Sequence, residues 1–91
     1  MSVREEVLDR AKTYVSQDRN TDYGEPEDNF AAIAYLWSKY LDTKIEPHEV
    51  AILMILVKVA RIKSSPNNAD NWIDIAGYAA CGAECVGPKD E

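Results

Sequence analysis

Four charged side chains in the second half of the chain have the types and spacing to bind an anion or a metal ion. Lys58 and Arg61 lie three residues apart and Asp70 and Asp74 lie four apart, so each pair occupies one face of a helix. A short loop between the two helices would make them antiparallel neighbours. The spacing therefore predicts that Lys58 lies near Asp74 and Arg61 near Asp70.

Two interpretations of this cluster remain open. As a lattice of salt bridges between helices, the four side chains would fix the register of the hairpin. As a ligand site, Lys58 and Arg61 would bind phosphate oxygens, while Asp70 and Asp74 would hold Mg²⁺, which takes a few carboxylate oxygens and keeps some of its waters.

The loop from Arg19 to Pro26 is a second candidate for ligand binding. Arg19 would add a cation for phosphate, and Tyr23 would offer a ring on which a base can stack, with Gly24 permitting a close approach. The alternative is a turn in which Tyr23 packs back onto the core.

Apolar residues recur at helical spacing in four segments, and nothing in the pattern predicts a strand. The expected helices cover about 3–17, 26–41, 47–63 and 70–85. Pro26 and Pro47 suit first helical turns, and Gly87 suits a helix end. The segment Val50–Val59 is apolar nearly all round, which predicts that this helix is the central and most buried one.

These helices predict one compact all-α, four-helix domain over residues 1–86, followed by a flexible polar tail at 87–91. The sequence Asp28-Asn29-Phe30 recurs 42 residues later as Asp70-Asn71-Trp72, and Ile33-Ala34 as Ile75-Ala76. The recurrence suggests two αα-hairpins related by internal duplication, with chance similarity as the alternative. A duplication would place both hairpin loops at one end and gather Arg19, Tyr23, Arg61 and Asp70 around one cleft.

Charge and composition narrow the classes of partner. Ten Lys and Arg face 16 Asp and Glu, which excludes a general nucleic-acid binder because such binding depends on neutralising phosphates. The N-terminus shows no apolar signal region, and Val50–Val57 is far shorter than the roughly 20 residues that span a bilayer. Cys81 and Cys85 are expected to be reduced thiols, because neighbours on one helix face suit a disulfide poorly. We therefore expect a cytoplasmic protein without membrane contact.

Self-association is expected because a chain of this size builds only a thin core. The predicted fourth helix is rich in Ala and Gly between residues 76 and 83, which permits close approach of another helix within the subunit or across a dimer. The sequence therefore predicts a homodimer built either on the apolar third helix or on the small-residue fourth.

Three runs carry a resemblance to a known family: 23–30, 58–62 and 70–78. They resemble short phage- and prophage-encoded proteins of unknown function, over roughly residues 18–84. A more distant resemblance is to nucleotide-modification-associated phage domains and MazG-like all-α nucleotide pyrophosphohydrolases. That superfamily holds Mg²⁺ with E-x-x-E on one helix and E-x-x-D on the next, and commonly forms dimers or tetramers.

This chain departs from the metal motifs of that superfamily. Asp70 and Asp74 lie where the second motif is expected, but Lys58 and Arg61 stand where E-x-x-E would be. Two cations in place of two carboxylates would repel Mg²⁺, so the hydrolysis mechanism does not transfer. Whether the protein is an enzyme stays open, and a pyrophosphohydrolase-like activity is what the resemblance would imply.

Two functional hypotheses follow. The first is a phage-type accessory protein that binds a nucleotide or its phosphates through Lys58, Arg61, Arg19 and Tyr23, with or without Mg²⁺. The second is a non-catalytic helical module that associates with itself or with another protein.

Overall fold

The computed structural model describes residues 2–18 and 25–87, and these form helices joined by short loops. The elements are α1 (Val3–Thr13), the π-helical turn η1 (Tyr14–Asp18), α3 (Pro26–Leu41), α4 (Pro47–Ser64) and α5 (Ala69–Val86). The all-α, four-helix prediction is confirmed, except that the first predicted helix ends in a π-helical turn. None of these helices combines the length and apolar character needed to cross a membrane.

Local sequence signals set the ends of the helices. Before α1, the Ser2 hydroxyl accepts the Glu5 N–H at 3.2 Å and the Glu5 carboxylate accepts the Ser2 N–H at 3.1 Å, which is a capping box. Before α4, the Glu49 carboxylate accepts the Glu46 N–H at 2.9 Å. Gly87, at φ 64°, ends α5 in the left-handed conformation that glycine adopts without strain.

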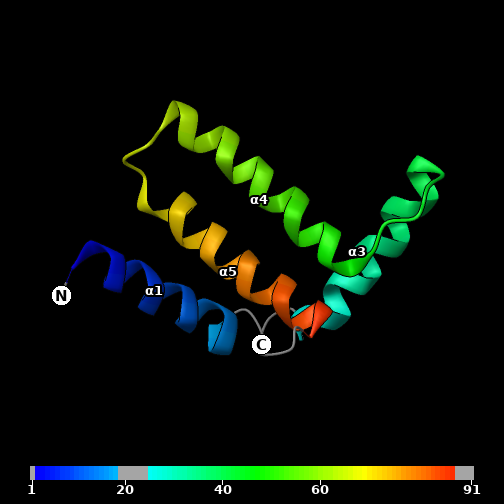
Figure 1. Cartoon of the computed structure of the whole chain (residues 1–91), viewed down its shortest axis with the longest axis horizontal. Coiled ribbons are helices and arrows are strands. Elements are labelled where there is room, and N and C mark those ends of the chain that lie inside the picture. Colours follow the sequence, from blue (N-terminus) through cyan, green and yellow to red (C-terminus); the bar gives the residue numbers. More distant parts are fainter. Residues whose placement is uncertain (1, 19–24, 88–91) are drawn as a thin grey trace.

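The helices α4 and α5 form an antiparallel hairpin at the centre of the fold (Figure 1). The helix α1 lies along the other side of α5, whereas α3 crosses the end of the hairpin where α4 begins and projects beyond it. Because α1 packs on α5 and not on α3, the described residues contain one αα-hairpin and not the expected two. The arrangement therefore does not support an internal duplication.

The core lies where α3, α4 and α5 meet. Val50 and Ala51 of α4 are almost fully buried against Phe30 and Ala34 of α3. The Phe30 ring also packs against Tyr78 of α5, with ring centroids 6.3 Å apart. Half-buried residues complete this cluster: Ile33, Trp37, Ile45, Met54, Cys81 and Cys85.

The described helices cover α4 on one side only. Five of its large apolar residues are 38–56% exposed: Ile52, Leu53, Leu56, Val57 and Val59. The prediction that this helix is the most buried element is therefore wrong for the side that faces away from α5. A helix that is apolar all round is fully buried only when neighbours cover both of its sides. The described helices cover one side of α4.

The small residues of α5 allow close approach within the subunit. A Cβ added at Gly82 would lie 2.9 Å from the Cβ of Ala51 on α4. A Cβ added at Gly77 would lie 3.3 Å from the Cγ1 of Val15 in η1. Gly82 and Gly77 are thus occupied by α4 and η1, whereas Ala79, Ala80 and Ala83 of α5 are exposed. The larger exposed apolar side chains of α4 make it the better candidate for contact between subunits.

We expect Gly82→Ala to lower the free energy of unfolding by about 1–2 kcal/mol in urea denaturation. The new methyl group would force the α4 and α5 backbones apart, at a cost of about 1–3 kcal/mol, which exceeds the gain of at most ~1 kcal/mol in helix propensity. Gly77→Ala is the matched control, because its methyl group meets only a side chain, and we expect it to be nearly neutral. Equal losses at the two positions would contradict this account.

Candidate functional site

The central ion pair of the predicted cluster is present. Lys58 Nζ on α4 lies 3.0 Å from Asp74 Oδ2 on α5, and the two side chains are 12% and 19% exposed. The antiparallel hairpin brings them together, as the spacing predicted. Because both groups are largely removed from water, their attraction is less screened than that of a surface pair. The pair is therefore well placed to fix the register of α4 against α5.

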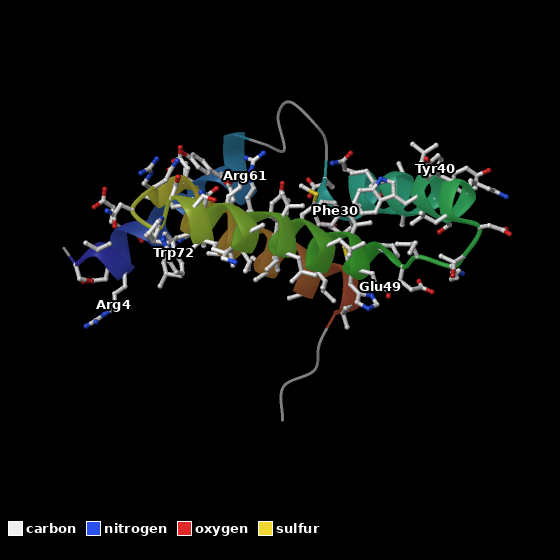
Figure 2. The ribbon with its side chains drawn as sticks, turned by 90° about the horizontal axis from the view of Figure 1, so that it is seen from above. Arg4, Phe30, Tyr40, Glu49, Arg61 and Trp72 are labelled. Atoms are coloured by element: carbon white, nitrogen blue, oxygen red, sulfur yellow. The ribbon has the colours of Figure 1, made fainter. Side chains whose placement is uncertain are left out.

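We predicted that Asp70 would lie near Arg61. It pairs instead with Arg10 of α1. Arg10 Nη2 lies 3.4 Å from Asp70 Oδ1 and donates to the Tyr14 hydroxyl at 3.2 Å. The hydrogen bond to Tyr14 raises the pKa of the Arg10 guanidinium, and the negative charge of Asp70 raises it further by a smaller amount. Arg61 is exposed near the C-terminal end of α4 (Figure 2). Sequence analysis missed Arg10 because its i, i+4 spacing to Tyr14 says nothing about which helix α1 packs against.

Both carboxylates of the predicted Mg²⁺ site are paired with cations in this arrangement. Each carboxylate faces a cation, Asp74 at Lys58 and Asp70 at Arg10, and a cation beside a carboxylate opposes metal binding. Within residues 2–18 and 25–87, no three His, Cys, Asp or Glu side chains gather in a way that could hold a metal ion. Arg19 and Tyr23, the other predicted ligand residues, lie outside the described residues, as does the tail after Gly87.

The two cysteines show no sign of metal or disulfide chemistry in the part of the chain that is described. Cys81 and Cys85 are half-buried on α5 and neither forms a disulfide, as predicted. Burial, followed by the carboxylates of Glu27 and Glu84, raises the pKa of the Cys85 thiol. A raised pKa lowers the thiolate fraction, which is the reactive form.

An open, mostly apolar groove of about 780 Å³ runs between α1 and the start of α5. Its lining includes Val3 and Leu8 of α1 together with Pro66 and Trp72. The Trp72 indole N–H donates to the Pro66 carbonyl at 2.9 Å, and its ring is 47% exposed. The groove depends on the position of α1, which residue spacing along the chain does not predict.

A run of exposed apolar side chains lies along α4. Its members are exposed and share the outer face of the helix at steps of three and four residues, and we name them the α4 stripe: Ile52, Leu53, Leu56, Val59 and Ala60. Single exposed apolar side chains are ordinary, but a contiguous patch is typical of an interaction surface. None of the other described helices lies over the side of α4 opposite α5 (Figures 1 and 2).

We expect Lys58→Met to lower the free energy of unfolding by about 3 kcal/mol, because it leaves the Asp74 carboxylate largely buried without its cation. The double substitution Lys58→Met with Asp74→Leu is expected to return close to the wild-type stability, because no charge is then left behind. Urea denaturation of the single and double variants completes a double-mutant cycle. A Lys58→Met protein as stable as the wild type would show that the pair does not secure the hairpin.

Comparison with known proteins identifies two relatives, both from phages. The chain is 44% identical over 77 residues to the Gene 55 protein of Mycobacterium phage D29, a match that covers 85% of this chain and 51% of that protein. It is 36% identical over 86 residues to the Gene 55 protein of Mycobacterium phage L5, covering 93% of this chain and 55% of that protein. The chain thus spans about half the length of these relatives. No solved structure matches it.

These relatives agree with the resemblance to phage-encoded proteins of unknown function, and they lend no support to the more distant one to MazG-like enzymes. A family model matches residues 6–86, which include most of α1 and all of η1, α3, α4 and α5. The chain therefore belongs to the family described as a domain of unknown function, DUF6378.

Proposed function

We propose that this phage-type accessory protein is a helical interaction module that acts by binding a protein surface through the α4 stripe. The observation that carries the proposal is the exposure of Ile52, Leu53, Leu56 and Val59, at 38–56% each, on one continuous helix face. Soluble monomers rarely leave such a face open to water.

Covering the stripe would be strongly favourable. Full burial of one large aliphatic side chain contributes about 1.5–3 kcal/mol, so four roughly half-exposed ones would contribute on the order of 4 kcal/mol before the entropic cost of association. Within the subunit, the opposite side of the same helix already shows this drive, because Val50 and Ala51 are almost fully buried there. A partner over the stripe would complete the burial of α4.

The charged cluster favours the interaction module over the nucleotide hypothesis. Lys58, the cation that would bind phosphate, already contacts Asp74 at 3.0 Å. A phosphate would have to displace that carboxylate, and its negative charge would then repel Asp74. The cluster is better explained as the element that holds α4 in place beneath the stripe.

Site-specific photo-cross-linking tests the proposal in cells that express the protein. A photo-reactive amino acid in place of Leu56 is expected to give covalent adducts with protein. The same group in place of Leu36, which is 63% exposed on α3, is the matched control and is expected to give far fewer adducts. The proposal would be wrong if the two positions gave equal amounts of adduct, or if neither position gave any.

Nucleotides are expected to leave the melting temperature unchanged, with or without Mg²⁺. A ligand present at about 100 times its Kd would add roughly 2.7 kcal/mol of stability, which is a shift of several degrees for a domain of this size. A thermal-shift screen of the common ribo- and deoxyribonucleotides measures this directly. A selective shift that Lys58→Met abolishes would favour the nucleotide hypothesis instead.

A further inference from the structure

The α4 stripe is nearly symmetrical about Leu56. Steps of three, four and seven residues all return to the same face of an α-helix, because one turn takes 3.6 residues. The positions equidistant from Leu56 are Leu53 with Val59, Ile52 with Ala60, and Glu49 with Lys63. Apolar residues therefore stand at equal distances on either side of Leu56. The outermost pair is charged.

The outermost pair is opposite in charge. Glu49 lies in the first turn of α4 and Lys63 lies in the last turn. Figure 2 shows the acidic end at Glu49 and the basic end, near Arg61, at opposite ends of this helix. The stripe is thus an apolar face that begins with a carboxylate and ends with an ammonium group.

A face of this kind is complementary to itself when two copies pack antiparallel. A two-fold axis at Leu56 would place Glu49 of each copy beside Lys63 of the other, and Leu53 of each beside Val59 of the other. Parallel packing would instead place Glu49 beside Glu49 and Lys63 beside Lys63, which is repulsive. Antiparallel helices also bring opposite ends of their dipoles together.

The spacing of the stripe suits such a pair. Apolar residues at alternating steps of three and four are the pattern by which two helices pack side by side, crossing at about 20°. The two glycines of α5 are already occupied, since Gly82 lies against Ala51 and Gly77 against Val15. The α4 stripe offers a second subunit larger apolar side chains than the exposed Ala79, Ala80 and Ala83 of α5 do.

We infer that the partner of the α4 stripe is a second copy of this chain, bound as a two-fold symmetric dimer with its α4 helices antiparallel and centred on Leu56. This inference rests on the proposed function and adds to it the identity of the partner and the register of the contact. Each apolar contact of the stripe then occurs twice, and two Glu49–Lys63 pairs flank the apolar centre.

Light scattering after size-exclusion chromatography tests the dimer. The purified wild-type chain is expected to have twice the 10.2 kDa mass of one copy. Leu56→Glu would place two carboxylates together at the axis and is expected to give a folded monomer, as circular dichroism would verify. Leu36→Glu is the matched control, because Leu36 on α3 is similarly exposed, at 63% against 56% for Leu56, and it is expected to remain a dimer.

A charge exchange tests the antiparallel register independently of the apolar centre. Lys63→Glu and Glu49→Lys would each turn both flanking pairs from attraction to repulsion, so each variant alone is expected to dimerise about tenfold more weakly at low salt. An equimolar mixture of the two variants restores opposite charges at both ends and is expected to form a heterodimer of wild-type affinity. Sedimentation velocity of each variant and of the mixture measures these affinities.

The outcomes separate the two proposals. A monomeric wild-type protein, or a Lys63→Glu variant that dimerises as tightly as the wild type, would overturn the second-copy dimer. If adducts from position 56 are then heavier than two copies of the chain, the interaction module stands with a different partner. If position 56 also gives no adduct above the control, both proposals fall.

Discussion

The close packing of α4 against α5 is the interaction on which the rest of the structure depends. Two contacts define it. Gly82 lies so close to α4 that a Cβ added there would be 2.9 Å from the Ala51 methyl group, and Lys58 meets Asp74 at 3.0 Å. The first sets the separation of the helices and the second sets their register. The other elements attach to this hairpin, η1 beside Gly77 of α5 and α3 over the start of α4.

What the sequence predicted correctly is what depends on residues close together along the chain. Helix positions follow from apolar periodicity and from caps such as the Ser2–Glu5 box, which involve neighbours on the chain. The Lys58–Asp74 contact belongs to the same class, because one short loop connects the two helices and limits their packing to a hairpin.

What the sequence could not predict depends on contacts between distant elements. Arg10 meets Asp70 across 60 residues of chain, and nothing in the spacing of α1 indicates that α5 is its partner. The same ambiguity produced the expectation of two similar hairpins. The likeness between residues 28–30 and 70–72 describes how α3 and α5 begin, and it carries no information about which helix each one packs against.

The apolar pattern of α4 does not show whether its residues pack within the subunit or against a partner. Periodicity distinguishes a helix with one apolar face from a helix with two, but it does not say which neighbours cover each face. Among the described residues, α5 and α3 cover only the side that holds Val50 and Ala51. The side that holds Leu56 is left exposed by these helices, and it is the side that the proposed partner would cover.

The same hairpin makes ligand chemistry at Lys58 unfavourable. Binding a phosphate there would break a contact between groups that are only 12% and 19% exposed, and Asp74 would lose its counter-ion without regaining water. Removing one partner of such a pair costs about 3–5 kcal/mol when it is fully buried, so a ligand must supply much of that before any net binding appears. Breaking the Lys58–Asp74 pair would also remove the contact that sets the register of α4 against α5. A protein that presents the outer face of α4 to a partner gains from a rigid Lys58–Asp74 pair, whereas a protein that binds phosphate at Lys58 would have to break it each time.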